Sequence, residues 1–286
     1  MTRTLTTPTP ESFSDLPFER RDFEIIARIA KTEFGLHIDI AKEAMIRSRL
    51  TKRIRHLNLP SFEAYCALVD TTGSEERDHF ISALTTNVTH FYREVHHFEA
   101  LEAEVLPPLL DQARQGRKIR LWSAACSTGP EAYSIAGSVL HLCPDADRLD
   151  IRILATDLDP VVLARAEAGT YRAEECRMPG EAWHRRVFGA ARPQDDRLAV
   201  RPELRRLITF RRLNLNGAWP TVGRFDAIFC RNVAIYFDKS TQETLWGRLA
   251  ECLDPGGYLF IGHSERVSGA PLDQLRSAGI TTYRRV

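Results

Sequence analysis

The first part of the chain carries its apolar residues at helical spacing. Along residues 18–34 they recur every three or four positions, which places them on one face of a helix: Phe23, Ile26, Ile29, Ala30 and Phe34. Gly35 then supplies a stop signal. The same period predicts three more helices, at residues 41–57, 61–69 and about 75–84, with Ser61 as an N-cap. Residues 18–84 are therefore predicted to form an all-helical domain.

The pattern changes after Gly116, where short apolar runs alternate with helical stretches. The predicted strands cover residues 119–124, 151–156, 208–210, 225–230 and 258–262. The predicted helices cover about residues 131–142, 160–168 and 241–252. Continuous apolar strands that alternate with helices are typical of a parallel sheet covered on both faces. Residues 119–286 are therefore predicted to form an α/β domain.

Three further segments complete the predicted organisation. Residues 1–17 are rich in Thr and Pro, and we expect them to form a flexible tail. Residues 85–118 are expected to connect the two domains through an apolar helix that Pro107-Pro108 should bend or break. Residues 169–206 are charged and irregular, and we interpret them as an insertion into the α/β domain.

Composition narrows the class of protein. The 39 Lys and Arg nearly cancel the 38 Asp and Glu, so we expect local electrostatic recognition and no nucleic-acid partner. The six cysteines form no C-x-x-C pair, which argues against a metal site and fits a reducing compartment. The N-terminus lacks the apolar core of a signal peptide, and no apolar run approaches the roughly 18 residues of a membrane span. These features predict a cytoplasmic protein.

Two strand ends carry candidate ligand-binding groups. The first strand runs into residues 125–131, a loop of small residues where a nucleotide-like ligand docks in an open α/β sheet. This loop lacks the G-x-G-x-x-G glycines of a dinucleotide site, which disfavours NAD; an ordinary turn is the alternative. Asp157 ends the second strand, where an acid can hold a ribose diol or simply stabilise a turn, and Asp159 is expected to cap the next helix. The pair of loops favours S-adenosylmethionine over NAD.

Polar residues elsewhere extend this candidate site. Arg231 and Asn232 follow the strand at residues 225–230 and could fix a ligand, while Tyr236 could line the reaction site or merely pack. Upstream, Asn87, Thr89 and Arg93 lie at the junction of the two domains, where binding residues are common. On spacing alone, a helix cap and a solvated arginine are the simpler interpretation of that junction.

Several segments together resemble one family, the bacterial chemotaxis receptor methyltransferases (CheR). They are residues 87–94 (NVTHFYRE), 122–129 (WSAACSTG), 155–159 (ATDLD), 214–215 (NL), 229–238 (FCRNVAIYFD) and 257–265 (GYLFIGHSE). The resemblance extends over about residues 18–286. It implies a helical N-terminal domain followed by a Rossmann-like, S-adenosylmethionine-dependent methyltransferase domain with a small β-subdomain in the insertion. It further implies methylation of glutamate side chains on chemoreceptors, with S-adenosylhomocysteine as the product.

The resemblance also implies roles for individual residues. The cofactor contacts carried over by motif are Asn87, Thr89, Arg93, Glu131, Asp157, Asn214, Leu215, Arg231 and Asn232. Asp157 would hold the ribose, and Asn214 and Leu215 would flank the adenine. We expect Arg93 or Tyr236 to orient the substrate carboxylate, with Arg93 on the cofactor's own carboxylate as an alternative. The family's loop usually reads Gly-Glu-Glu-Pro-Tyr-Ser, whereas this chain has Pro130 and Ala132 at its first acid and its proline.

The second predicted helix is strongly basic. It carries six bases, namely Lys42, Arg47, Arg49, Lys52, Arg53 and Arg55, against the single acid Glu43. A charge run of this kind is usually a solvated face. Because chemoreceptor methylation helices are rich in Glu, the resemblance favours Arg47, Arg49, Lys52, Arg53 and Arg55 as a docking surface for the receptor's cytoplasmic helical domain. The protein would then meet the membrane only through receptors, and we expect a monomer.

Three other functions fit parts of the sequence. A methyltransferase acting on RNA or a small molecule could use the basic helix, although that helix lacks the aromatic residues for base stacking. A signalling module could bind S-adenosylmethionine without turnover, given the substitutions at Pro130 and Ala132. An NAD-dependent oxidoreductase is the alternative at the level of the fold. Binding of S-adenosylhomocysteine but not NAD would exclude the last of these.

Overall fold

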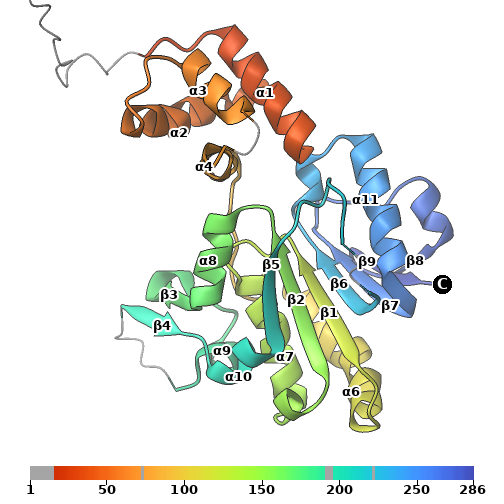
Figure 1. Ribbon diagram of the computed structural model, residues 1–286. Coiled ribbons are helices and arrows are strands. Elements are labelled where there is room, and N and C mark those ends of the chain that lie inside the picture. The colour runs from red at the N-terminus through yellow and green to blue at the C-terminus, as the bar shows by residue number, and fades with distance from the viewer. Residues whose placement is uncertain (1–15, 72–73, 191–195, 221–222) are drawn as a thin grey trace, which may run out of the picture. The chain divides into compact units, whose positions relative to one another are not determined.

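The computed structural model describes residues 16–71, 74–190, 196–220 and 223–286 (Figure 1). The chain divides into two compact units, with the boundary after Thr85. All but the last two residues of the tail expected at residues 1–17 lie outside the described residues. No helix of the described residues is both long enough and apolar enough to span a bilayer.

The first unit is helical, as its hydrophobic period predicts. Its helices are α1 (Arg20–Phe34), the short η2 (Ile40–Lys42), α2 (Glu43–His56), α3 (Phe62–Asp70) and α4 (Glu76–Leu84). Gly35 ends α1 in the left-handed conformation with φ of 72°, which confirms the predicted stop signal. Ser61 accepts a hydrogen bond from the Ala64 N–H and so caps α3, also as predicted.

The second unit is built on a seven-stranded sheet with the order β5-β2-β1-β6-β7-β9-β8. The strands are β1 (Ile119–Ala124), β2 (Ile151–Asp157), β5 (Ile208–Arg212), β6 (Phe225–Cys230), β7 (Leu253–Ile261), β8 (Leu275–Gly279) and β9 (Thr282–Arg285). Strands β5, β2, β1, β6 and β7 are parallel, and all five were predicted. Their carboxyl ends therefore share one edge of the sheet.

The prediction of a wholly parallel sheet is wrong at the C-terminus. There, β9 runs antiparallel to both β7 and β8, so the sheet is mixed. The hairpin escapes a search for apolar runs because it is short and mostly polar: only Leu275 in β8 and Thr282 in β9 are buried. Such an antiparallel edge is common on otherwise parallel sheets.

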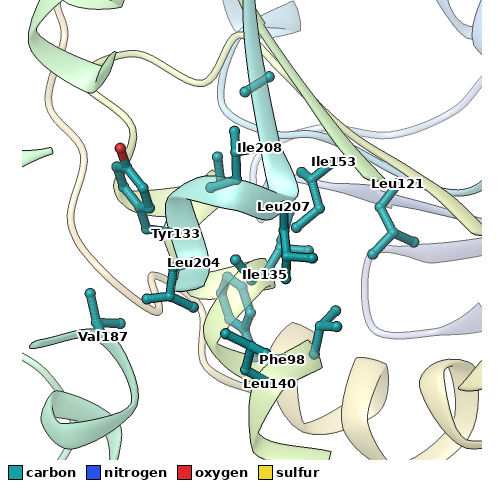
Figure 2. Packing of buried hydrophobic residues seen from close by; sticks show 14 of the residues in the cluster. Phe98, Leu121, Tyr133, Ile135, Leu140, Ile153, Val187, Leu204, Leu207 and Ile208 are labelled. Atoms are coloured by element: carbon teal, nitrogen blue, oxygen red, sulfur yellow. The ribbon is translucent and has the colours of Figure 1, made fainter. Parts of the chain in front are cut away.

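The core of this unit lies where helices pack on the sheet. The helices after β1 are α7 (Pro130–Leu142), α8 (Pro160–Ala168), α9 (Glu181–Phe188), α10 (Pro202–Leu207) and α11 (Lys239–Cys252), and the short helical turns are η4 (Ala146–Arg148), η5 (Ala173–Glu175), η6 (Ala234–Tyr236) and η7 (Ala270–Asp273). Figure 2 shows Ile135 and Leu140 of α7 among Leu204 and Leu207 of α10 and the strand residues of the sheet. Burial of this continuous apolar cluster is what holds the strand ends in place.

The segment before β1 stays helical through its two prolines. It consists of α5 (His96–Ala100), a π-helical turn η3 (Leu101–Val105) and α6 (Leu106–Arg114). Pro107 and Pro108 lie in the first turn of α6, where the missing proline N–H costs little. The π-turn directly before them is the irregularity that the two prolines predict.

The insertion contains a small antiparallel sheet. Its strands are β3 (Thr170–Arg172) and β4 (Arg197–Ala199), which pair with each other, and α9 lies between them in the chain. The predicted fold class is thus confirmed: a Rossmann-like α/β unit with a small β insertion, preceded by a helical N-terminal unit. Residues 191–195 of the insertion lie outside the described residues.

Candidate functional site

The loop after β1 is tightly folded at the shared edge of the sheet. Ala125, Ser127 and Gly129 all adopt positive φ, at 65°, 52° and 98°. Gly129 has no substitute here, because a Cβ atom would lie 2.9 Å from the Tyr171 hydroxyl and 3.0 Å from Ala166 Cβ. The small residues noted in the sequence therefore serve the backbone conformation of this loop, which brings its N–H groups next to the end of β2.

Asp157 is buried at that end of β2, and both of its carboxylate oxygens accept backbone hydrogen bonds. Oδ2 accepts from the Ser127 N–H at 2.8 Å and Oδ1 from the Asp159 N–H at 3.0 Å. Burial raises the pKa of Asp157 to about 6, against the opposing effect of these N–H groups. The carboxylate thus stabilises the turn, and each oxygen keeps one further acceptor position for a ligand.

Asp159 caps α8, as predicted, and also anchors the junction segment. Its Oδ1 accepts from the Val161 N–H at 2.9 Å, while Oδ2 accepts from Asn87 Nδ2 at 3.2 Å. Asn87 therefore does not cap a helix, which corrects the simpler interpretation of the junction. Arg93 is not purely solvated either, since its Nη1 donates to the Val88 carbonyl at 3.0 Å.

Arg231 is the centre of a buried ionic network. Its side chain is 1% exposed, and Nη1 lies 3.1 Å from Glu131 Oε2 while Nη2 lies 3.2 Å from Glu94 Oε2. Nη2 also donates to the backbone carbonyl of Arg93. Ser123 holds the other oxygen of Glu131 through a 2.7 Å hydrogen bond. One guanidinium thus links β6, the first turn of α7 and the junction segment.

The network sets the charge of both acids. Burial raises the pKa of Glu131, and Arg231 and Ser123 oppose this shift. Burial also disfavours the ionised form of Glu94, but Arg231 and a hydrogen bond from His263 outweigh it and lower the pKa of Glu94 to about 2. Nearby, burial and the Arg231 charge lower the pKa of His97 to about 3, so this imidazole is neutral at pH 7. The cluster therefore holds one fixed cation between carboxylates.

The predicted adenine residues lie beside Asp157. The Leu213 N–H donates to the Asp157 carbonyl at 2.9 Å, which places the segment after β5 against the end of β2. Asn214 Oδ1 accepts from the Asn216 N–H at 3.0 Å, and Leu215 is buried. Arg248 of α11 fixes this segment through the Leu215 carbonyl at 3.0 Å. Asn214 and Leu215 therefore have a defined place at the edge of the site.

A cavity of about 440 Å³ adjoins the junction segment. It is lined by Asn87, Val88, Thr89, His90, Thr128, Pro130, Arg165, Tyr171, Glu174, Glu175 and Arg177. Of the predicted cofactor residues, Asn87 and Thr89 line this cavity, whereas Glu131, Asp157 and Arg231 do not. Asn87 joins the cavity to the strand ends, because it lines the cavity and also donates to Asp159.

Comparison with known proteins identifies the family. The family model described as CheR methyltransferase, SAM binding domain matches residues 87–283, and that described as CheR methyltransferase, all-alpha domain matches residues 21–85. The chain belongs to the CheR methyltransferase family. The resemblance found in its motifs is thereby confirmed.

Relatives in this family match nearly end to end. A protein named probable chemotaxis protein methyltransferase from Rhizobium etli is 47% identical, over 88% of this chain and 95% of its own length. Chemotaxis protein methyltransferase 2 from Pseudomonas aeruginosa is 39% identical, over 97% of this chain and 98% of its own length. Chemotaxis protein methyltransferase from Escherichia coli is also 39% identical, over 90% and 86%.

The residues at the strand ends of this CheR-family chain fit S-adenosylmethionine. Asp157 offers acceptor positions to a ribose diol, and the buried Ser127 Oγ beside it has no hydrogen-bond partner among the described residues. Glu131, Arg231 and Asn232 bring both charges and an amide to the same edge of the sheet, a set of groups that can pair with the ammonium and carboxylate of an amino acid. Pro130 fits the start of the helix, because it occupies the first position of α7 and its carbonyl accepts from Ser134 Oγ at 2.7 Å, while Ala132 is buried.

Two of the five bases that the sequence predicts as a docking surface on α2 instead bind groups of their own helical unit. Arg53 makes a bidentate ion pair with the buried Glu76, with both contacts at 2.7 Å, and Arg49 donates to the carbonyls of Ala83 and Thr85. Both side chains are partly buried and stabilise the helical unit, so the expectation that all five bases form an outer stripe needs correction for these two. Arg47, Lys52 and Arg55 are exposed on α2.

Two acids at this site, Glu94 and Glu265, are not among the residues predicted from the sequence. Glu94 forms an ion pair with Arg231 and hydrogen bonds with His263 and Asn232. The buried Glu265 accepts backbone hydrogen bonds from the turn after β6. Both stand in segments quoted for the resemblance, yet neither has an assigned role there. In the sequence, each is simply an acid next to a predicted strand or junction. Such an acid looks the same as a solvated surface residue until its burial is known. Tyr236, in η6, is half-buried.

Proposed function

We propose that this chain transfers a methyl group from S-adenosylmethionine to glutamate side chains in the cytoplasmic helical domain of chemoreceptors. The products are a glutamate methyl ester and S-adenosylhomocysteine. The observation that carries the proposal is the convergence of Asp157, Glu131 and Arg231 at the carboxyl edge of the sheet, within a chain of the CheR family. The protein would act in the cytoplasm, as a monomer, and reach the membrane only through receptors.

When bound, S-adenosylmethionine supplies an electrophilic methyl group on a positively charged sulfur. Asp157 would accept hydrogen bonds from the ribose, while Asn214 and Leu215 would flank the adenine. Glu131, Arg231 and Asn232 would bind the amino-acid end, and Asn87, Thr89 and Arg93 would close over the ligand from the junction segment. The ionic network fixes Glu131 and Arg231 relative to each other, and groups fixed in this way reduce the entropic cost of alignment.

The acceptor needs no general base. A glutamate carboxylate is ionised at pH 7 and is already the nucleophile. The protein's contribution is then to align the carboxylate oxygen with the methyl group and to exclude water from it. We assign the orienting role to Arg93 or Tyr236, which lie on the junction segment and on the turn after β6. Arg93 on the cofactor's carboxylate remains the alternative role for that residue.

The helical domain, proposed at residues 18–84, would recognise the receptor. Arg47, Lys52 and Arg55 give α2 an exposed positive surface, and an acidic receptor helix is its electrostatic complement. Arg49 and Arg53 would act indirectly, by fixing α2 to α4 through Glu76 and through the carbonyls at the end of α4. Residues 85–118 would connect this domain to the catalytic domain at residues 119–286, with 169–206 as its insertion.

The test is methyl transfer to receptor-containing membranes with S-adenosylmethionine labelled in its methyl group. The proposal predicts label on the receptor that is released as methanol by mild alkali, because esters hydrolyse and N-methyl groups do not. A receptor whose acceptor glutamates are replaced by alanine should take up no label. Binding of S-adenosylhomocysteine without any transfer would instead support a signalling module that binds the cofactor without turnover.

A further inference from the structure

The turn after β7 places a buried carboxylate under the turn after β6. Glu265 is 4% exposed, and its two oxygens accept four backbone N–H groups. Oε1 accepts from Val233 at 3.0 Å and Ala234 at 2.7 Å, while Oε2 accepts from Asn232 at 2.9 Å and Gly262 at 2.6 Å. Four hydrogen bonds saturate the acceptor capacity of a carboxylate, so Glu265 has none left for a ligand.

The turn at residues 232–234, which Glu265 holds, has an uncommon backbone conformation. Asn232 has φ of 59°, in the left-handed region, and the three successive N–H groups of residues 232–234 point at a single carboxylate. Successive N–H groups in such a turn form a concave anion site, and here a side chain of the same chain occupies it. Without that anion, the three N–H groups would lose their hydrogen bonds at a cost in free energy.

Gly262 allows Glu265 to come close to the turn after β6. A Cβ atom at this position would lie 2.8 Å from the Asn232 nitrogen and 2.8 Å from Glu265 Oε2, closer than real Cβ atoms come. A glycine therefore lets the ends of β6 and β7 meet through the carboxylate. Among the described residues Glu265 has no cationic partner within ion-pair distance, so its charge depends on these N–H groups for compensation.

We propose that Glu265 is a positioning residue of the reaction centre. Its ionised carboxylate fixes the turn that presents Arg231 and Asn232 to the cofactor and leads into Tyr236. The inference rests on the proposed function for the identity of the ligand, but the anchoring itself stands on the hydrogen bonds. Asn232 Nδ2 reaches Glu94 at 3.4 Å and Arg231 reaches Glu131 at 3.1 Å, so a change in this turn propagates into the ionic network.

Glu265→Gln tests the proposal with little change in volume. The amide retains one acceptor oxygen, and its NH₂ group faces N–H donors that it cannot accept from. In the folded variant, we expect the Kd for S-adenosylhomocysteine to rise about tenfold or more and kcat to fall roughly 100-fold, the scale of a small misplacement of reacting groups. Glu265→Asp keeps the charge and should recover part of both losses.

Glu76→Gln is the matched control, because it also neutralises a buried glutamate that binds its own chain, but in the helical unit. It should lower the unfolding temperature while leaving the Kd of the folded protein for S-adenosylhomocysteine unchanged, since that ligand binds the other unit. If Glu265→Gln behaves in the same way, Glu265 is merely structural and the proposal is overturned.

Gly262→Ala covers the case in which Glu265→Gln does not fold, since the added methyl group separates Glu265 from the turn. It should show the same losses of affinity and turnover, and a folded Gly262→Ala with wild-type Kd and kcat would overturn the proposal. Failure of the proposed function has a different signature. Wild-type protein would then fail to bind S-adenosylhomocysteine or to methylate receptors, before any variant is compared.

Discussion

Arg231 Nη1 lies 3.1 Å from Glu131 Oε2, although 100 residues separate the two along the chain. The contact joins the residue after β6 to the first turn of α7, which follows the loop after β1. Since Glu94 holds the second guanidinium nitrogen, the ion pair also fixes the junction segment. A single buried cation thus assembles three parts of the catalytic unit that the sequence presents far apart.

Replacing Arg231 by Met should therefore destabilise the fold. The change leaves the carboxylates of Glu131 and Glu94 without their cation in a buried site, and breaking such a pair costs about 3–5 kcal/mol. Denaturant unfolding measures the loss. Arg152→Met, at an exposed position in β2, should change the free energy of unfolding by less than about 0.5 kcal/mol. Equal stabilities for the two variants would contradict the account of the network.

Binding of S-adenosylhomocysteine should weaken in mild acid. The pKa of Asp157 is about 6, and ribose hydroxyls bind its ionised form, so the Kd should rise up to tenfold per pH unit as pH falls below 6. Asp157→Asn should bind weakly with a flat profile from pH 7.5 to 5. A wild-type Kd that is constant over this range would rule out Asp157 as the ribose acceptor.

The same carboxyl affects stability with the opposite sign. Its folded pKa of about 6 lies above the usual 3.8, so the folded protein binds the proton more tightly than the unfolded chain does. Its contribution to stability is complete below about pH 4 and is lost as pH rises through 6. In the absence of ligand, Asp157→Asn should therefore gain stability relative to wild type between pH 5 and 7.5, as thermal unfolding at each pH would show.

The two candidates for orienting the acceptor can be separated by kinetics. Tyr236→Phe removes one hydroxyl and should lower kcat roughly 10- to 100-fold while leaving the affinity for S-adenosylhomocysteine unchanged, if Tyr236 acts on the acceptor. Arg93→Ala should lower kcat alone if Arg93 orients the acceptor, and should raise the cofactor Kd if it binds the cofactor's carboxylate. An Arg93→Ala enzyme with wild-type turnover and affinity would exclude both roles of that residue.

Receptor docking should depend on the exposed bases of α2. Reversing charge at Arg47 and Lys52 should raise the KM for receptor several-fold, more strongly at low salt, with kcat little changed. Lys118→Glu, an exposed reversal outside the helical unit, is the control and should leave the KM unchanged. A KM that does not respond to charge reversal at any ionic strength would mean that α2 is simply a solvated helix.

The sequence predicts the framework of the fold because local signals carry it. Five parallel strands and the helices that follow them have continuous or periodic apolar positions, and Asp159 and Ser61 cap helices as their residue types require. The C-terminal hairpin was not predicted, because a short edge hairpin with few buried side chains has no such pattern. The polar strand ends were predicted as a site because parallel strands share one edge.

The contacts within the site could not be read from the sequence. Whether Arg53 faces solvent or Glu76 depends on the packing of α2 against α4, and the hydrophobic period does not resolve this. Glu94 and Glu265 look like ordinary surface acids until the fold buries them. Arg231, by contrast, was predicted at the site, but its pairing with Glu131 needs the three-dimensional arrangement of β6 and α7.

The strand ends around Asp157 are where we propose that S-adenosylmethionine binds. The most direct test is calorimetric titration of S-adenosylhomocysteine into wild-type protein and into Asp157→Ala. We expect micromolar binding by the wild type and a loss of roughly 10- to 100-fold in the variant, the cost of removing a hydrogen bond to a charged group. Equal affinities, or no binding to a folded wild type, would contradict it.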